Sequence, residues 1–266
     1  KDEEGDWEDW IEIYNAGDTS VNLDGWSLTD DPRQPGQWVF PAVSLTAKRY
    51  LVVFASGKNR RPTAANARLH TNFKLGIAGE YLGLYNAESP RLAVSELAPQ
   101  YPEQRNDVAF GRHPSGAWRY FMIATPGAAN ASTWVSDVVE PVHFSVPRGF
   151  FAKPFNLSLA CPTPGAAIRY TIDGSAPSLT NGLLYTNLIG INGTRVIRAA
   201  AFRSSSLPSK VTTHTYLYNQ SPLRRTLPAL SLVTASNHLY GKTGIMEYNP
   251  RNTLKHGLAW ERPVSA

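Results

Sequence analysis

The sequence predicts an all-β protein built from two β-sandwich domains in tandem, and three observations support this fold class. Apolar and polar residues alternate with a period of two over many short stretches, as in strands with one buried face. Groups of Gly, Pro, Ser and Asn separate these stretches at regular intervals. A helical period is almost absent, so the pattern favours sandwiches over helical or mixed folds.

The first pair of strands is expected in residues 9–31, which read DWIEIYNAGDTSVNLDGWSLTDD. Apolar residues alternate with polar ones on both sides of a turn-forming group, Asn15, Gly17 and Asp18. Asn, Gly and Asp tolerate positive φ or cap their own backbone. We therefore predict a hairpin across this turn.

The following strands are shorter, with one exception. Residues 50–54, YLVVF, form a nearly continuous apolar run, which predicts a central strand covered on both faces. Residues 69–75 and 80–85 flank the short link 76–79 and predict a second hairpin. Further strands are expected at residues 94–97, 108–110 and 118–122, the last of which would close the domain.

A second β pattern begins after a linker, residues 132–141. Six strand-like runs follow, separated by Pro, Gly, Ser or Asn. These runs cover residues 143–151, 155–161, 167–178, 183–189, 194–202 and 213–218. Beyond them, residues 227–234 predict one more strand, and residues 255–266 lead into another.

Several blocks of the first half occur together in one known family. They are DWIEIYNAGDTSVNLDGWSLTDD, WVFP, YLVVFASGK, LHTNFKLGIAGEYLGLYN and ATPGAAN, in this order. This half closely resembles the lamin-tail domain, an immunoglobulin-like β-sandwich with bacterial members. The resemblance implies the same architecture for residues 1–131.

The string YTIDGSAPSLTNGLLYTNLIGINGTRVIRAAAF resembles the fibronectin III-like module at the C-terminus of chitobiases, through its Asp173-Gly174 turn and its RAAAF strand. Residues 142–218 are assigned to this module, which is non-catalytic in that family. Residues 219–266 resemble the truncated start of a CotH-type, kinase-like domain. They lack a matching nucleotide- or metal-binding motif, so the resemblance gives Lys242 and Lys255 no kinase role.

Charge is divided unequally between the halves. Residues 1–131 hold 13 Lys and Arg against 16 Asp and Glu, whereas residues 132–266 hold 13 against 5. The arginines of the basic half are scattered, which favours solvated faces over a specific nucleic-acid site. Cys161 is the single cysteine, so no internal disulfide and no CxxC metal pair can form. We interpret it as a buried or half-buried structural thiol.

The sequence contains none of the phosphate-loop, HExxH, GxSxG or GxGxxG motifs. We therefore predict no catalytic residue, no metal site and no cofactor. The acidic start, KDEEGDWE, lacks the spacing of a calcium loop, and a solvated acidic turn is favoured over a calcium site. No apolar run is long enough to span a membrane, and no signal-peptide pattern is present.

Exposed aromatic residues are the remaining candidates for recognition. Some tryptophans lie beside turns or linkers, where they could contact a ligand or a neighbouring domain. These are Trp7, Trp10, Trp134 and Trp260. Others lie at alternating strand positions and are expected in the core, namely Trp26, Trp38 and Trp118.

The chain is therefore interpreted as non-catalytic binding or spacer modules of a larger secreted or cell-surface bacterial protein. The expected partner is a protein, an envelope component or a glycan, and the expected state is a monomer or weak oligomer. One alternative is that the chain positions the substrate of a CotH-type kinase whose catalytic core lies beyond residue 266. Another is carbohydrate binding through the exposed tryptophans.

Overall fold

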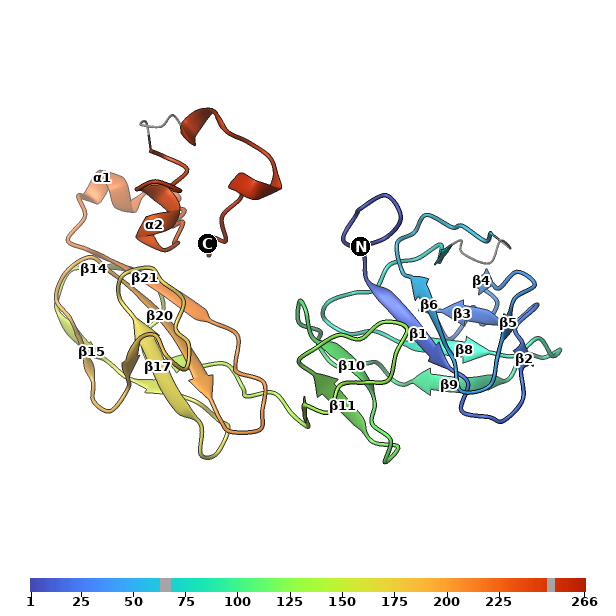
Figure 1. Ribbon diagram of the computed structural model, residues 1–266. Coiled ribbons are helices and arrows are strands. Elements are labelled where there is room, and N and C mark those ends of the chain that lie inside the picture. The colour runs from blue at the N-terminus through green and yellow to red at the C-terminus, as the bar shows by residue number, and fades with distance from the viewer. Residues whose placement is uncertain (63–67, 248–251) are drawn as a thin grey trace. The chain divides into compact units, whose positions relative to one another are not determined.

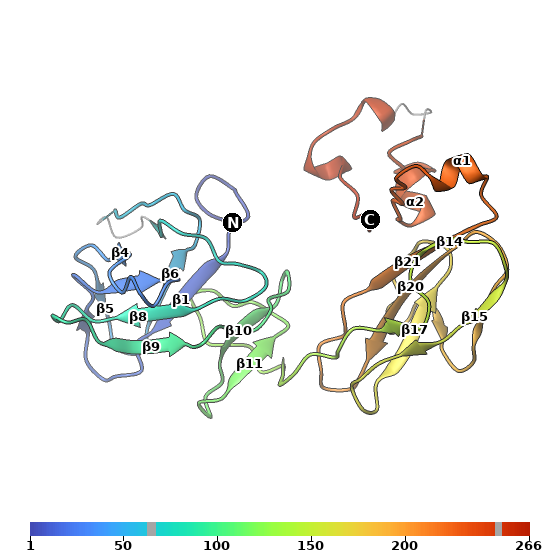
Figure 2. The ribbon, with the colours of Figure 1, turned by 180° about the vertical axis from the view of Figure 1, so that it is seen from behind.

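The structure is a computed structural model that describes residues 1–62, 68–247 and 252–266. Strands provide nearly all of its regular secondary structure. The chain divides into two compact units, residues 1–134 and 135–266, and each unit is built around β-sheets (Figure 1; Figure 2 shows the same chain from behind). The all-β prediction is confirmed.

The first unit is formed by short strands that pair in the orders β1-β6-β7, β2-β5, β4-β3-β8-β9 and β10-β11-β12. Their bounds are β1 (Trp10–Tyr14), β2 (Val21–Asn22), β3 (Ser27–Thr29), β4 (Trp38–Val39), β5 (Ser44–Leu45), β6 (Tyr50–Phe54), β7 (Leu69–His70), β8 (Leu82–Tyr85), β9 (Ala93–Leu97), β10 (Ala109–Arg112), β11 (Trp118–Phe121) and β12 (Trp134–Val135).

Apolar residues on paired strands form the core of the first unit. Ile11 on β1 lies opposite Val53 on β6, and Leu28 on β3 lies opposite Leu84 on β8. All four belong to one buried cluster, which also contains the fully buried Trp38. Because burial of apolar surface is the main favourable term in folding, the alternation seen in the sequence is what holds these sheets together.

The hairpin predicted in residues 9–31 is wrong, because β1 pairs with β6 and β2 pairs with β5. The turn at Asn15 carries the chain from one sheet to another. The Asn15 side chain is buried, and its Nδ2 donates to the carbonyl of Thr19 (2.8 Å) and to that of Leu45 (2.9 Å). The bond to Leu45 ties the turn to β5, a contact 30 residues away in sequence.

The second predicted hairpin is also wrong. β7 pairs with β6 in parallel, whereas β8 pairs with β3 and β9. The link at residues 76–79 therefore joins two sheets instead of two neighbouring strands. The central position predicted for residues 50–54 is confirmed, since β6 lies between β1 and β7. Full cover on both faces is not found, because Tyr50, Leu51 and Val52 are half-buried.

The second unit contains a five-stranded sheet in the order β14-β21-β20-β17-β18 and the smaller pairs β13-β16 and β15-β19. The strand bounds are β13 (His143–Phe144), β14 (Gly149–Phe151), β15 (Phe155–Leu157), β16 (Leu159–Ala160), β17 (Ala167–Thr171), β18 (Leu183–Leu184), β19 (Ile189–Ile191), β20 (Arg195–Phe202) and β21 (Thr212–Tyr218).

The long strand β20 supplies the centre of the second core. Ile197, Ala199 and Ala201 on one face of β20 are fully buried, and Ala201 lies opposite Ile168 on β17. Alanine at these positions leaves space for larger side chains of the facing strands, such as Leu157, which is also fully buried.

Residues 219–266 are called the C-terminal segment below, and their described part, 219–247 and 252–266, forms short helices and loops. The helices are α1 (Pro222–Arg225), α2 (Ser236–Leu239), η1 (Asn252–Leu254) and η2 (Leu258–Trp260). The strand predicted at residues 227–234 is wrong, because only Val233 makes a bridge there, with Ser265. Pro228 lacks the N–H that a strand ladder needs. The strand expected to begin in residues 255–266 is likewise reduced to that bridge.

Candidate functional site

The acidic residues at the start of the chain fold into a closed loop (residues 1–8, the N-terminal loop). One carboxylate oxygen of Asp2 accepts the backbone N–H groups of Glu4 (3.0 Å) and Asp6 (2.9 Å). The backbone N–H of Asp2 in turn donates to the carbonyl of Asp6 (3.0 Å). Short acidic side chains cap their own backbone in this way, so contacts within residues 2–6 close the loop.

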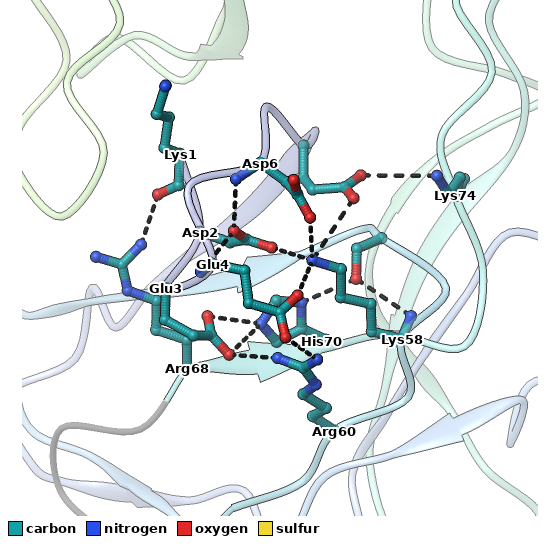
Figure 3. Close-up of polar contacts among 12 residues, drawn as sticks. Lys1, Asp2, Glu3, Glu4, Asp6, Lys58, Arg60, Arg68, His70 and Lys74 are labelled. Atoms are coloured by element: carbon teal, nitrogen blue, oxygen red, sulfur yellow. Dashed lines mark hydrogen bonds and ion pairs between the residues drawn. The ribbon is translucent and has the colours of Figure 1, made fainter.

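Lys58, in the loop after β6, docks the N-terminal loop onto the sandwich (Figure 3). Its ammonium group binds the second carboxylate oxygen of Asp2, and it also binds Glu4 (2.7 Å) and Asp6 (2.8 Å). The Asp2 side chain is fully buried, and that of Lys58 is 19% exposed. Buried charges must be paired, and these residues are paired with one another.

Arg60 and His70 hold the other side of the loop. Arg60 binds Glu3 (2.8 Å) and Glu4 (2.5 Å). The fully buried His70, on β7, contacts Glu3 through Nε2 (3.0 Å) and the Ser56 hydroxyl through Nδ1 (2.8 Å). The acidic turn expected from the sequence is present and mostly exposed, but the burial of Asp2 and the ion pairs of the turn were not expected. We call this set the ionic cluster: Asp2, Glu3, Glu4, Asp6, Lys58, Arg60 and His70.

The pKa values in the ionic cluster follow from these contacts. The hydrogen bond from Lys58 lowers the pKa of Asp2 to about 2. Partial burial opposes the shift of Glu3, but its own backbone N–H, His70 and Arg60 together lower its pKa to about 2. The pKa of Lys58 is raised by its bonds to Asp2, Asp6 and Glu4. At neutral pH Lys58 is therefore protonated, which excludes it as a nucleophile or a general base.

Two groups within the N-terminal loop and β7 have the donor atoms of a cation site. They are Asp2, Glu3 and His70, and Asp2, Asp6 and Glu8, with ligand atoms within 4.8 Å of one another in each group. The Lys58 ammonium already binds Asp2 and Asp6, and Arg60 already binds Glu3. A metal ion would have to compete with these built-in cations. The geometry thus supports a structural role for the ionic cluster.

The tryptophans proposed for recognition lie in different surroundings. Trp7 is 73% exposed with the Lys1 ammonium 4.8 Å from its ring, while Trp10 is half-buried on β1. Trp134, on β12, is 40% exposed. Trp260, in the second unit, is half-buried beneath the Lys255 ammonium at 4.4 Å.

The tryptophans expected in the core also differ among themselves. Trp38 is fully buried, and Trp26 is half-buried against the first core. Trp118 is half-buried on β11 and stacks on Phe110, with ring centroids 5.5 Å apart. The core prediction thus holds fully for Trp38 and only in part for the other two.

Strands β10, β11 and β12 bring aromatic and cationic side chains together. The Arg112 guanidinium lies 5.0 Å from the Trp118 ring, and that of Arg119 lies 4.8 Å from the Trp134 ring. His113 is 5.2 Å from Trp134. No Asp or Glu occurs between Asp107 and Asp137 in the sequence, so this positive charge has no acidic neighbour along the chain. Arg112 lies opposite Trp118 and Gly111 lies opposite Arg119, so Phe110, Arg112 and Trp118 share one face of the hairpin, and Arg119 lies with Trp134 on the other. We call the two faces together the hairpin surface: Phe110, Arg112, Trp118, Arg119 and Trp134.

Sequence reasoning missed Lys58, Arg60 and His70, which lie more than 50 residues from the acids they bind. The signal available was an acidic run at the chain start and a basic run, Lys58 to Arg61, of opposite charge. Nothing in the sequence says that the two runs meet.

Cys161 is half-buried just after β16, and its thiol donates to the carbonyl of Glu140 (3.3 Å). These contacts fit the structural role expected for it. Across residues 1–62, 68–247 and 252–266, no helix has the length and apolar character needed to cross a membrane.

Two family models match the chain. Residues 1–98 match the Lamin Tail Domain, and residues 146–213 match the Chitobiase/beta-hexosaminidase C-terminal domain. No curated protein matches the chain. Neither family match extends to residues 219–266, so the start of a CotH-type domain stays a prediction. Residues 1–98 are thus similar to lamin tail domains, and residues 146–213 are similar to chitobiase/beta-hexosaminidase C-terminal domains.

Proposed function

We propose that the chain consists of binding and spacer modules of a secreted or cell-surface bacterial protein. In this proposal the first sandwich recognises an acidic protein partner through the hairpin surface. The second sandwich holds the first at a set distance from the C-terminal segment. The observation that carries the proposal is the positive, aromatic character of the hairpin surface on an otherwise acidic unit.

Exposure supports this choice of surface. Met122 and Ile123, which directly follow β11, are 47% and 60% exposed, and Trp134 is 40% exposed. Tryptophan and arginine are the residues most often found at the energetic centre of protein interfaces. The guanidinium of Arg112 has no ion pair among the described residues, so an acidic group of a partner could bind it without displacing a carboxylate of this chain.

The ionic cluster is a poorer candidate for the partner surface. Its carboxylates are already bound by Lys58, Arg60 and His70. A partner would have to break these contacts before making its own. The hairpin surface carries no such cost.

Arg112→Ala and Trp134→Ala test the proposal in the full chain. Each substitution is expected to reduce about tenfold the amount of partner protein that the chain recovers from a cell-envelope extract. This is the loss typical of an interface hot spot. Arg33→Ala is the matched control, because Arg33 is 87% exposed on the same unit and, among the described residues, its ion pair is with its neighbour Asp31. Equal recovery by all three variants and the unchanged chain would contradict the proposal.

Carbohydrate binding is a second candidate, favoured by the 73% exposure of Trp7. An aromatic face of this kind can stack on a sugar ring. Titration of the full chain with soluble glycans should then quench tryptophan fluorescence, and Trp7→Ala should remove the response. If Arg112→Ala changed the glycan response instead, the hairpin surface and not Trp7 would be the sugar site.

A further inference from the structure

The C-terminal segment lies on the second sandwich, on the outer face of the five-stranded sheet. Ile197 and Ala199 of β20 face the core, so the alternate residues Val196 and Arg198 face outward. Val196 lies opposite Thr215 on β21, which places both side chains on this outer face. The Thr215 hydroxyl bonds to that of Ser231 in the C-terminal segment (2.7 Å).

The turn after β17 makes a closer contact with the same segment. Gly174 has a φ of +81°, and a Cβ added to it would lie 2.3 Å from the carbonyl oxygen of Thr234 and 3.2 Å from its carbonyl carbon. No real side chain tolerates the first distance. Only glycine therefore permits this approach of two backbones.

Hydrogen bonds within the second sandwich hold the Asp173-Gly174 turn in place. The Arg198 guanidinium donates to the carbonyl of Gly174 (2.8 Å), and its Nε donates to the Thr213 hydroxyl (3.3 Å). The Asp173 carboxylate accepts the backbone N–H (3.0 Å) and hydroxyl (2.6 Å) of Ser175. A turn fixed by these bonds presents a defined surface to the segment.

The segment is also fixed on its own side. Val233 is buried, and its backbone N–H and carbonyl pair with Ser265 at 2.7 and 2.8 Å. The Thr234 hydroxyl donates to the carbonyl of Pro263 (2.7 Å). An open groove of about 430 Å³ runs beside this contact, between the turn, the start of β20 and the segment.

We propose that the Asp173-Gly174 turn and the outer face of β20 and β21 are a docking surface for residues 231–239. The second sandwich is then a rigid coupler, which fixes the direction in which the chain leaves it. This inference rests on the spacer role proposed above and sharpens it, because a flexible tether would need neither the glycine contact nor the buried Val233.

Amide hydrogen exchange of the full chain tests the coupler with Gly174→Ala and Gly165→Ala. Gly165 has a similar φ of +74°, but no atom lies within 4 Å of an added Cβ. Both variants carry the same backbone strain, and only Gly174→Ala collides with Thr234. Exchange in residues 231–239 is expected to rise at least about tenfold in Gly174→Ala and to change little in Gly165→Ala. Equal exchange in both variants would overturn the proposal.

If Gly174→Ala unfolds the sandwich, Val233→Ala serves as the second test. Val233→Ala alters only the C-terminal segment's side of the contact and leaves the sandwich residues unchanged. Faster exchange in residues 231–239, with β20 still protected, supports docking. Unchanged exchange in residues 231–239 overturns it. The hairpin surface lies in the other unit and takes no part in this measurement, so the recognition proposal and the coupler proposal fail separately.

Discussion

The two ends of the chain are docked on their sandwiches by different chemistry. The N-terminal loop is held by ion pairs, with Asp2 and Glu4 bound to Lys58. The C-terminal segment is held by a close backbone contact at Gly174 and a hydroxyl bond at Ser231. Ion pairs respond to pH and salt, whereas backbone and hydroxyl contacts respond little to either. The two ends should therefore be released under different conditions.

Composition explains the contrast. Residues 1–9 contain six acidic residues, whereas residues 231–239, SLVTASNHL, contain none and no Lys or Arg. A segment rich in like charges cannot dock without cations beneath it. A segment of small, polar and apolar residues needs a surface that admits its backbone. The folded units provide Lys58 for the first and Gly174 for the second.

The largest effect is expected from Lys58→Met, which leaves the buried Asp2 carboxylate without its cation. Removing one partner of a buried ion pair is strongly destabilising, since the other charge stays buried and unpaired. The N-terminal loop should therefore undock, and amide exchange in residues 2–6 should rise at least about tenfold while the C-terminal segment is unchanged.

Lys48→Met is the matched control for Lys58→Met. Lys48 also pairs with an aspartate, Asp18 at 2.9 Å, but both side chains are exposed. Exposed pairs contribute little, so this variant should leave the exchange of residues 2–6 unchanged. Similar behaviour of the two variants would mean that the burial of Asp2 does not matter, and the contrast between the two ends would lose its basis.

Acid should release the N-terminal loop and spare the C-terminal contact. The pKa of Asp2 falls from 3.8 to about 2 on docking, and that of Glu3 from 4.5 to about 2. A lowered folded-state pKa contributes stability above the unfolded value, and this stability is lost as the pH falls through the folded value. Undocking is therefore expected between about pH 4.5 and pH 2. The NMR signals of residues 2–6, recorded across an acid titration, measure it.

Asp2→Asn separates charge from hydrogen bonding in the acid titration. An amide oxygen can still accept the N–H groups of Glu4 and Asp6, but it carries no charge to titrate. The variant should show a smaller acid transition in residues 2–6. The contact between Ser231 and Thr215 joins two hydroxyl groups that do not titrate in this range, so it is the internal reference. Release of both ends at the same pH would contradict the comparison.

Much of the fold was predictable from local pattern. The alternation around Ile11 and Leu28 indicated buried strand faces, and the apolar run of residues 50–54 indicated a central strand. The pairing of the strands was not predictable. A turn group such as Asn15 with Gly17 fits a hairpin, and only the bond from Asn15 to Leu45 shows that the chain crosses to another sheet.

The ionic cluster could not be predicted for a related physical reason. Local sequence shows that residues 1–8 are acidic, but the burial of Asp2 depends on where Lys58 and His70 lie after folding. Exposed tryptophans such as Trp134 were identified as recognition candidates because turns and linkers are visible in sequence. The positions of Arg119 and His113 beside Trp134 depend on how the strands pair, and they could not be predicted.

The smallest effect is expected at the hydroxyl pair of Thr215 and Ser231, which a double-mutant cycle can isolate. Thr215→Val and Ser231→Ala each remove one partner of a half-buried neutral hydrogen bond, so their coupling energy should be about 1 kcal/mol. The opening free energy of the Val233 amide, from hydrogen exchange, is the quantity to measure. Thr186→Val, which alters an exposed hydroxyl elsewhere in the second unit, should leave this opening free energy unchanged.

A coupling energy near zero would assign the docking of the C-terminal segment to the Gly174 contact and the burial of Val233 alone. A value well above 1 kcal/mol would mean that the hydroxyl pair contributes more to docking than a neutral hydrogen bond usually does.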